Sequence, residues 1–376
     1  MATILRATIR CLAWFAALAF GAPAFALDGV VGPANCDEAG FNGVLAAVNA
    51  SGGGTITFDC GTATIPFTAY KPIGGAVTID GRGTITFDGA NTSAFFQVFF
   101  SANATLRRLT LRRGTFAAAH ALENFGALRL ERVQVQDSLS AGPTVVNHGT
   151  LTVIESMFRG NANTATGLDG DGGAIAHDGE YLYIDASTFA ANSAGRHGGA
   201  VFSSNVLTIE NSTFTGNQAG SGGGAVYQTG SGNSAILQAT FADNAAVFGG
   251  AIYNDGSASS TLNIRASIMA GNSGGNCDGV LTSGGDNLWF AGTNCPFSAT
   301  GDGPGNPVLG TLASNGGPTQ TRMPGTGSAA IDRISPARCI LSMDQRGARR
   351  PAGAGCDSGA VEAGAVIDTI FQDGFE

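Results

Sequence analysis

The chain has 376 residues, of which 58 are glycine, 43% are hydrophobic and 12% are charged. It is too apolar for an intrinsically disordered chain, and its glycines lack the every-third-residue spacing of collagen. The formal net charge of −9 argues against nucleic acid as a partner, because a phosphate backbone attracts basic surfaces.

The first 26 residues have the three parts of a secretory signal peptide. Arg6 and Arg10 give a positive start, CLAWFAALAF is a short apolar run, and AFA at positions 24–26 is a small-x-small cleavage site. The alternative, an N-terminal membrane anchor, needs a longer apolar run. We therefore expect a secreted or outer cell-surface protein whose mature chain begins at Leu27 and has no transmembrane span.

Residues 27–54 are expected to cap the fold at its N-terminus. The apolar residues of the segment 37–50 recur at helical spacing: Phe41, Val44, Leu45 and Val48. A short amphipathic helix there would cover the open end of a coiled β structure, whose terminal turn otherwise exposes backbone and core.

From residue 55 to residue 276 the chain repeats short strands, as in GGGTITF, AVTIDGRGTITF and ATLRRLTLRR, which alternate apolar and polar residues. Over roughly residues 150–275 Gly-Gly-Ala recurs at steps of 25 or 26 residues, at Gly172, Gly198, Gly223 and Gly249. A Phe-x-x-Asn pair recurs in phase with it, with methionine replacing phenylalanine in the last copy: Phe158/Asn161, Phe189/Asn192, Phe214/Asn217, Phe241/Asn244 and Met269/Asn272.

Each repeat is expected to form one turn of a parallel β-helix. An aliphatic residue lies five positions before each aromatic one, and their opposite parity requires a corner between them, as at Glu210-Asn211. The aliphatic and aromatic side chains should stack in a dry interior, and the glycines should form corners that a Cβ would obstruct. The asparagines, in the left-handed conformation, should bond to one another as a ladder. About ten turns at about 4.8 Å predict a rod of roughly 50 Å.

Six cysteines follow the signal peptide, which suits an oxidising compartment. Of the fifteen possible pairings, the sequence-local one fits a solenoid best, because distant segments of a solenoid do not meet. It joins Cys36 with Cys60, Cys277 with Cys295, and Cys339 with Cys356. None of these cysteines has zinc-site spacing, so we expect no metal there.

Residues 277–361 lack the repeat and are rich in glycine, proline and turn dipeptides. They are expected to form a C-terminal cap held by two of the disulfides. Residues 362–376 are expected to be a tail, whose final IFQDGFE is either a sorting signal or an ordinary exposed end.

Two family resemblances accompany these patterns. The Gly-Gly-Ala-Ile/Val and Phe-x-x-Asn motifs are similar to the repeats of polymorphic outer membrane proteins, which form right-handed parallel β-helices. The stretches GDNL, NCPF, NPVLGTLASNGGPTQT, GSAAID and DQRGARRPAGAGCDSGAVE resemble the choice-of-anchor Q domain of bacterial surface proteins, and CDEAGFNGVLAAVNASGGGTITF resembles the start of such proteins.

The resemblances imply an all-β chain folded as a right-handed parallel β-helix, with a varied sorting or anchoring tail. Two features depart from these families. A polymorphic outer membrane autotransporter carries a C-terminal membrane barrel, for which the residues after 361 are too few. The Leu-Pro-x-Thr-Gly sorting signal is also absent.

Parallel β-helices include pectate lyases and polygalacturonases, so the fold alone does not settle function. The best candidates for catalysis lie in GLDGDGGAIAHDGE and one repeat later: Asp169, Asp171, His177, Asp178, Arg196 and His197. Adjacent turns should place Asp171 beside His197. In a lyase, carboxylates would hold calcium and a basic residue would remove a proton beside a uronate carboxylate.

A structural interpretation of the same residues is the one we favour: Asp-Gly turns and loop histidines without a catalytic role. The polygalacturonase motif of Asn-Thr-Asp, paired Asp-Asp and Gly-His-Gly is absent, and no histidine lies in a nucleophile elbow. A local basic cluster could meet an acidic glycan, although a solvated edge of the coil is the favoured interpretation: Arg107, Arg108, Arg112, Arg113, Arg129 and Arg132.

We therefore expect a secreted or cell-surface β-helix protein without catalysis or cofactor, adhesin-like or interacting with the cell envelope. Its partner would be a surface glycan or a host or envelope component. The longest interruption of the repeat, residues 161–170, is the expected ligand edge. The alternative is a polysaccharide-degrading enzyme, which would need a carboxylate–arginine cluster lying in a groove.

Overall fold

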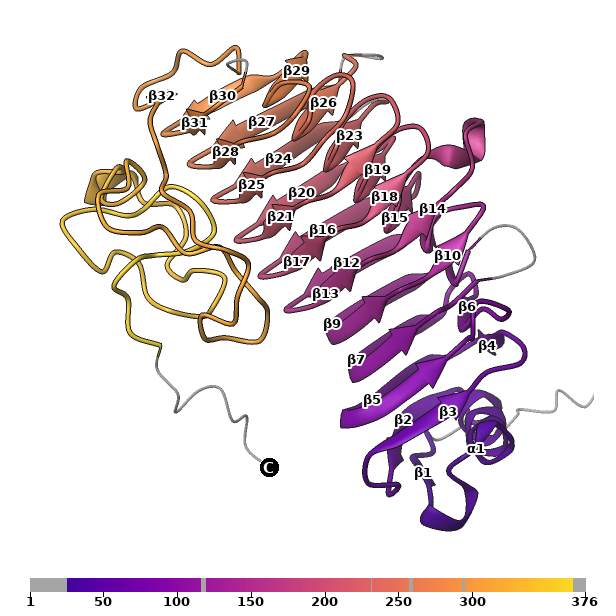
Figure 1. The fold of residues 1–376 in the computed structure, drawn as a ribbon. Coiled ribbons are helices and arrows are strands. Elements are labelled where there is room, and N and C mark those ends of the chain that lie inside the picture. Colours follow the sequence, from indigo (N-terminus) through magenta and orange to yellow (C-terminus); the bar gives the residue numbers. More distant parts are fainter. Residues whose placement is uncertain (1–25, 116–119, 231, 257–259, 293–294, 368–376) are drawn as a thin grey trace, which may run out of the picture.

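The computed structural model describes residues 26–115, 120–230, 232–256, 260–292 and 295–367. The chain is a parallel β-helix of about ten turns, as the sequence predicts (Figure 1). Across the described residues, no helix has both the length and the apolar character needed to cross a bilayer. The predicted signal peptide and the IFQDGFE tail lie almost wholly outside the described residues.

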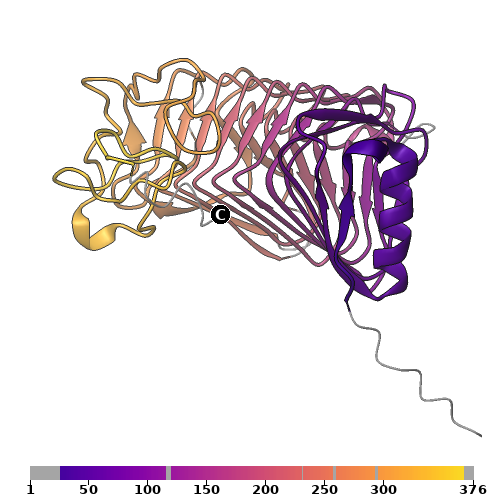
Figure 2. The ribbon, with the colours of Figure 1, turned by 90° about the horizontal axis from the view of Figure 1, so that it is seen from below.

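The predicted helix closes the first turn. Helix α1 (Glu38–Ala50) begins at Asp37, whose carboxylate accepts a hydrogen bond of 2.8 Å from the Gly40 N–H. It buries Phe41, Leu45 and Val48 against strands β1 (Gly29–Val31) and β2 (Gly53–Phe58). Figure 2 shows the helix lying across the open end of the coil. A 3-10 turn, η1 (Pro33–Asn35), precedes it.

Sheet A, of 19 strands within the described chain, runs the length of the rod and is bent along its middle. Each turn contributes one strand on either side of the bend, and in β5, β7 and β9 the two are continuous. Besides β1 and β2, its strands are β3 (Ala63–Pro66), β5 (Ala76–Asp88), β7 (Asn103–Arg112), β9 (Ala127–Gln136), β12 (Thr150–Ile154), β13 (Met157–Arg159), β16 (Tyr181–Asp185), β17 (Thr188–Ala190), β20 (Leu207–Glu210), β21 (Thr213–Thr215), β24 (Asn233–Leu237), β25 (Thr240–Ala242), β27 (Thr261–Arg265), β28 (Ile268–Ala270), β30 (Thr282–Gly285), β31 (Leu288–Phe290) and β32 (Gly303–Pro304).

Sheets B and C complete the cross-section, and every pairing between turns is parallel. The strands of sheet B are β4 (Lys71–Ile73), β6 (Phe96–Val98), β8 (Leu122–Asn124), β11 (Val145–Asn147), β15 (Ile175–His177), β19 (Val201–Ser203), β23 (Val226–Gln228), β26 (Ile252–Asn254) and β29 (Cys277–Gly279). The short strands of sheet C are β10 (Leu139–Ser140), β14 (Ala162–Asn163), β18 (Ser193–Ala194) and β22 (Gln218–Ala219).

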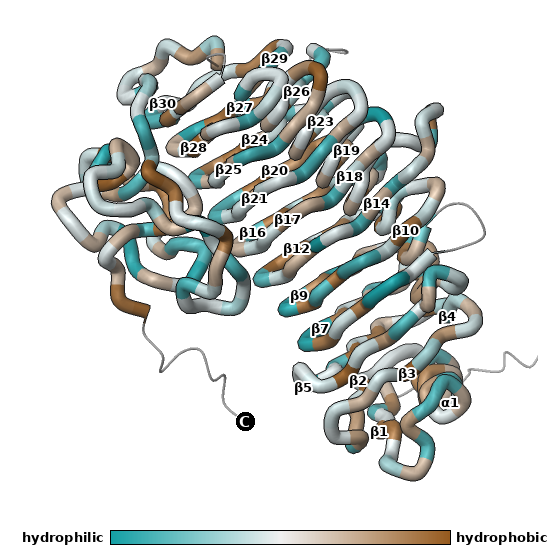
Figure 3. The backbone as a smooth tube through the Cα atoms, in the orientation of Figure 1, coloured by the Kyte–Doolittle hydropathy of each residue, from teal (hydrophilic) through white to brown (hydrophobic). Residues whose placement is uncertain are grey.

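The interior consists of stacked equivalents, as predicted. The rings of Phe158, Phe189, Phe214 and Phe241 lie 4.7, 4.8 and 4.9 Å apart in succession, and Met269 continues the stack in register. Figure 3 shows hydrophobic and hydrophilic residues alternating along the strands. The phenylalanines are fully buried, so each repeat supplies one layer of the core.

A buried asparagine ladder runs beside the aromatic stack. Its members are Asn161, Asn192, Asn217, Asn244 and Asn272, and each side-chain N–H₂ donates to the carboxamide oxygen of the next at 2.9 or 3.0 Å. The predicted left-handed conformation of these asparagines is wrong. The residue before each asparagine has the positive φ, as in Ala191 and Gly216, and this turn directs the asparagine side chain inward.

The Gly-Gly pairs form close corners. The first glycine has a positive φ, 64° at Gly198, and a Cβ on the second glycine, Gly199, would lie 2.2 Å from a backbone oxygen of the next turn.

The arginine cluster forms the edge of the coil. Four of its members reach two buried carboxylates, Asp80 and Asp88, and the others pair with Glu131 and Glu155: Arg107, Arg108, Arg112, Arg113, Arg129 and Arg132.

The three predicted disulfides are present: Cys36–Cys60, Cys277–Cys295 and Cys339–Cys356.

The coil continues past residue 276, because β29 to β32 keep parallel pairing although the repeat motif has ended. Apolar side chains and backbone hydrogen bonds are sufficient for the last turn without the full motif.

Residues 305–367, here called the C-terminal lobe, fold back along the coil (Figure 1). The lobe covers the outer side of β17, β21, β25 and β28, where it buries Thr188, Thr213, Thr240 and Ile268. Gln345 is the main anchor, since its carboxamide accepts from Thr213 Oγ1 at 2.6 Å and donates to Thr188 Oγ1 at 2.9 Å. The lobe contains one 3-10 turn in its described part, η4 (Pro336–Arg338).

A buried ion network explains the DQRGARRPAGAGCDSGAVE stretch. Arg350 donates to Glu362 at 3.1 Å, Arg346 pairs with Asp344 at 2.8 Å, and these side chains are almost completely buried. Asp357 accepts two backbone N–H bonds in the same network, and burial raises its pKa to about 6. Glu362 therefore belongs to the lobe rather than to the expected tail.

Candidate functional site

The outer face of sheet B carries one outward residue per turn. In each three-residue strand the first and third side chains point into the coil and the middle one points out. The outward row in chain order is Pro72, Gln97, Glu123, Val146, Ala176, Phe202, Tyr227, Tyr253 and Asp278. The row from β4 to β26 spans seven strand spacings, or roughly 34 Å.

A hollow of about 350 Å³ lies over the middle of this row. Its floor is Val146 and Ala176, whose small side chains are followed by the ring of Phe202. The walls come from loops at the two ends of the strands. One wall carries His148 and Asp178, and the other carries Asp169 and Asp171 with His120, Pro143 and Leu168.

Asp171, Arg196 and His197 form a cluster across two turns. The Arg196 guanidinium binds the Asp171 carboxylate with two donors, one of them at 2.7 Å, and His197 Nδ1 lies 3.1 Å from Asp171 Oδ1. This confirms the predicted placement of Asp171 beside His197. Burial lowers the pKa of His197, so its ring is predominantly neutral at pH 7 and can donate one hydrogen bond and accept another.

The opposite wall holds a second histidine between two carboxylates. His148 Nδ1 lies 2.6 Å from Asp178 Oδ1, and its Nε2 lies 3.9 Å from Glu123 Oε1. The ring also stacks on Phe125 at 4.9 Å, which fixes its plane. A carboxylate that orients an imidazole is the arrangement found where a histidine moves protons.

Two further hollows adjoin the first one. His120 is shared with a hollow of about 130 Å³ that includes Tyr70, Gln97 and Glu123, and His148 is shared with one of about 470 Å³. Burial lowers the pKa of His120, against the opposing effect of Glu123 3.5 Å away. The three hollows form one half of this face of sheet B, and we call the whole face the sheet B groove.

The other half of the groove is aromatic. Tyr227 stacks on His197 at 4.2 Å, on Tyr253 at 5.1 Å and next to Phe202 at 5.7 Å, with rings within 19° of parallel. Burial raises the pKa of Tyr227 to about 12, so its hydroxyl stays protonated.

No family model, curated protein or solved structure matches the chain. The interpretation of the groove therefore depends on its own geometry.

The structure separates the six predicted candidates. Asp171, Arg196 and His197 come together, while Asp169 and Asp178 lie at opposite rims of the hollow. The choice of His177 as a candidate site residue was wrong. His177 is the third residue of β15, and its ring points into the coil and is fully buried.

The inward position of His177 follows from strand alternation. There it continues a column of interior polar side chains, with Nδ1 2.8 Å from Asn147 Nδ2 and Nε2 3.2 Å from the Val206 carbonyl. Both ring nitrogens are engaged, so His177 is a structural residue with no access to a ligand.

The calcium that a lyase would need does not fit the geometry at Asp169 and Asp171. The Asp171 carboxylate is already engaged by Arg196 and His197, and Asp169 accepts a 2.7 Å hydrogen bond from Asn163 through its backbone carbonyl. Within the described ranges, no three His, Cys, Asp or Glu side chains converge as a metal site would require.

Sequence reasoning missed the aromatic row and the second histidine. The aromatic residues had a signal, because each lies four residues after the first glycine of its repeat, as Phe202, Tyr227 and Tyr253 do. His148 and Glu123 had none, because they lie in turns without the Gly-Gly-Ala motif. The expected ligand edge, residues 161–170, does border the groove through η2 (Leu168–Gly170).

Proposed function

We propose that the protein is an extracytoplasmic, non-catalytic β-helix rod that binds a glycan chain along the sheet B groove. Such a protein would act as an adhesin or interact with the cell envelope. The three disulfides support an oxidising compartment outside the cytoplasm. Secretion through a cleaved signal peptide is part of the proposal.

The observation that carries the proposal is the continuity of the aromatic row with the polar hollow. Phe202, Tyr227 and Tyr253 form an outward aromatic column over successive turns, and because their rings stack on one another they offer apolar ring edges to the C–H groups of a sugar chain. The hollow then offers carboxylate, imidazole and carboxamide groups, which pair with hydroxyl groups. A site with apolar side chains and a few fixed polar groups is typical of small-ligand recognition.

Binding of soluble glycans to the chain from Leu27 onward tests the proposal. We expect at least one polysaccharide of a panel of pectin, polygalacturonate, alginate and hyaluronan to bind in affinity electrophoresis or calorimetry. Tyr227→Ala should weaken that binding at least about tenfold, because it removes the central ring of the aromatic row.

The matched control is Tyr181→Ala, which removes an outward tyrosine of sheet A on another face. It should leave binding unchanged. Equal loss with both variants, or binding that Tyr227→Ala does not affect, would contradict glycan binding in the groove.

A second candidate, cleavage of an acidic polysaccharide, is favoured by one observation. The His148–Asp178 pair and Asp171, which binds Arg196 and lies beside His197, line the same hollow from opposite sides. An enzyme would need a carboxylate–arginine cluster in a groove, and the Asp171–Arg196 pair meets this requirement only in part, because Arg196 does not line the hollow. In a lyase, His148 would take the proton beside the uronate carboxylate and Asp178 would hold the ring in place.

Product release separates the two candidates. The same polysaccharides are incubated with the protein, with and without calcium, while unsaturated-sugar absorbance and new reducing ends are followed. A rod predicts binding without release. Release that His148→Ala abolishes, with the melting temperature unchanged, would replace the binding function with an enzymatic one.

A further inference from the structure

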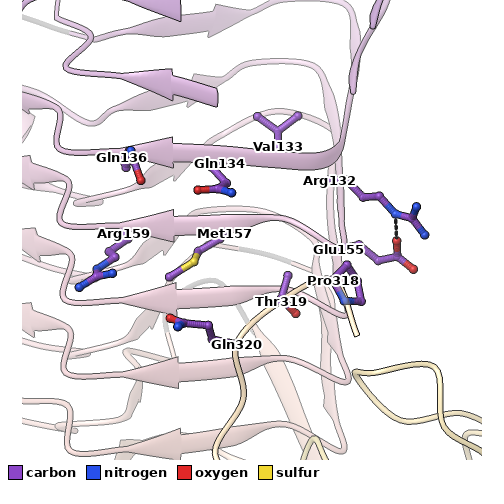
Figure 4. A pocket seen from close by; sticks show the side chains of 10 residues that line it. All are labelled: Arg132, Val133, Gln134, Gln136, Glu155, Met157, Arg159, Pro318, Thr319 and Gln320. Atoms are coloured by element: carbon purple, nitrogen blue, oxygen red, sulfur yellow. Dashed lines mark hydrogen bonds and ion pairs between the residues drawn. The ribbon is translucent and has the colours of Figure 1, made fainter. Parts of the chain in front are cut away.

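A cleft of about 370 Å³ lies on sheet A, on a different face from the sheet B groove. Its floor consists of outward side chains of two neighbouring strands, Gln134 and Gln136 on β9 and Met157 and Arg159 on β13. Figure 4 shows these side chains side by side, with Pro318, Thr319 and Gln320 of the C-terminal lobe next to them.

The cleft exists because the lobe stops one turn short. Thr188 on β17 is covered by the lobe, whereas Met157, its register partner on β13, is only partly covered and Gln134 on β9 is exposed. The edge of the lobe, residues 318–320, therefore forms a wall beside an uncovered floor.

The wall is fastened to the coil before any ligand arrives. Thr319 Oγ1 donates to the Ala186 carbonyl at 2.9 Å, and Thr188 Oγ1 donates to the Gln320 carbonyl at 2.5 Å. Gln345 donates to Thr319 Oγ1 at 2.9 Å from inside the lobe. A preformed cleft binds a small ligand with little ordering cost.

The cleft is positively charged in an acidic protein. Its lining contains two arginines and one carboxylate, and that carboxylate, Glu155, pairs with Arg132 at 2.5 Å. The side chain of Arg159 makes no hydrogen bond or ion pair with the described residues. In Figure 4 it lies at the opposite end of the cleft from the Arg132–Glu155 pair. Arg159 thus offers an unused guanidinium fork, which fits a carboxylate.

We propose that this cleft binds one carboxylate-bearing sugar ring, a uronate, with Arg159 on the carboxylate. The carboxamides of Gln134 and Gln136 both donate and accept, as pairing with ring hydroxyls requires, and Met157 supplies an apolar surface beneath the ring. The volume lies at the small end of the range for ligand sites, which suits a single sugar ring rather than a long chain.

The test measures binding of free glucuronate and galacturonate by calorimetry at low ionic strength. Glucose serves as the neutral probe and inorganic phosphate as the probe for an unspecific anion site. We expect at least one uronate to bind at least about tenfold more tightly than glucose or phosphate, and to weaken with added salt. Equal affinity for glucose, or tighter binding of phosphate, would overturn the uronate assignment.

Two variants locate the site. Arg159→Gln should remove uronate binding, and Gln134→Ala should weaken it. Both side chains are exposed, so neither substitution should disturb the core. The matched control is Arg129→Gln, an arginine of the same β9 strand that pairs with Glu131 outside the cleft.

The outcome is independent of the glycan-binding proposal. Tyr227→Ala in the sheet B groove should leave uronate binding in the cleft unchanged. Uronate binding that Tyr227→Ala removes and Arg159→Gln does not would place the ligand in the groove and contradict the cleft. Absence of uronate binding in the unaltered protein would also contradict it, whatever the groove binds.

Discussion

The coil and the C-terminal lobe are held together in different ways. In the coil each layer repeats the one before it, and Phe214 contacts its equivalents Phe189 and Phe241 on both sides. The lobe has almost no regular secondary structure, and a disulfide and a buried ion network hold it instead. Periodic apolar stacking therefore supports the rod, whereas specific polar contacts fix a non-periodic segment to its side.

The largest expected effect concerns the coil. Phe214→Ala removes a fully buried ring from the middle of the stack and should lower the free energy of unfolding by about 3–5 kcal/mol. Denaturant unfolding followed by circular dichroism measures this loss. Phe202→Ala, which removes an outward ring on β19 of the same turn, should cost clearly less. Equal losses would mean that the interior stack is not the main support of the coil.

The next effect concerns the lobe. Arg350→Met leaves the buried Glu362 carboxylate without its cation and should cost about 3–5 kcal/mol of lobe stability. We expect faster proteolysis within residues 305–367 while the coil keeps its hydrogen-exchange protection. Arg349→Met, at the exposed neighbouring position, should change neither. If the coil lost its hydrogen-exchange protection together with the lobe, the two regions would unfold as one unit.

A smaller effect tests the polar ladder inside the coil. Asn217→Ala leaves the carboxamides of Asn192 and Asn244 without one partner each and should cost about 1–3 kcal/mol. The melting temperature measures it, with Asn233→Ala at an exposed strand position as the control. A variant as stable as the original protein would mean that the ladder only specifies register.

The smallest effect is a difference in pH dependence. Burial lowers the pKa of His177 below its usual 6.5, so near that pH the unfolded state binds more protons than the folded state, and the coil loses stability as pH falls through 6.5. Asp357 in the lobe acts oppositely. Its pKa is raised to about 6, so its protonation favours the folded lobe as pH falls from about 6 toward 3.8.

Hydrogen exchange at pH 7 and pH 5 separates the two contributions. Amides near β15 should become less protected at pH 5. His177→Asn should reduce that change, because asparagine occupies the equivalent interior position at Asn147 and does not titrate. Asp357→Asn should reduce the pH response of the lobe alone. An unaltered coil response in His177→Asn would assign it to His120 or His197 instead.

Much of the fold could be predicted from the sequence. The capping helix, the aromatic stack, the asparagine ladder, the glycine corners and the three disulfides all follow from periodicity and local spacing. The left-handed conformation was predicted at each asparagine, but the residue before it has the positive φ. The motif marks the corner without showing which of the two residues adopts that conformation. His177 was misplaced for a related reason, since only its register within β15 decides that it points inward.

The candidate site was less predictable than the coil. Asp171 beside His197 followed from the 26-residue step of the repeat. The partners of His148 did not, because Glu123 and Asp178 lie in turns whose loops differ in length. The cleft at Arg159 had no sequence signal, since its wall comes from residues 318–320.

The sequence by itself determined the rod. Equivalent residues recur once per turn, the Gly-Gly-Ala glycines every 25 or 26 positions. A solenoid brings together only the equivalents of neighbouring turns, so a repeat that is visible in the sequence predicts which residues are in contact. Only the tertiary structure decided where the lobe lies and which hollows it creates. Its anchor, Gln345, meets Thr213 across 132 residues, and no periodic pattern encodes a contact of that separation.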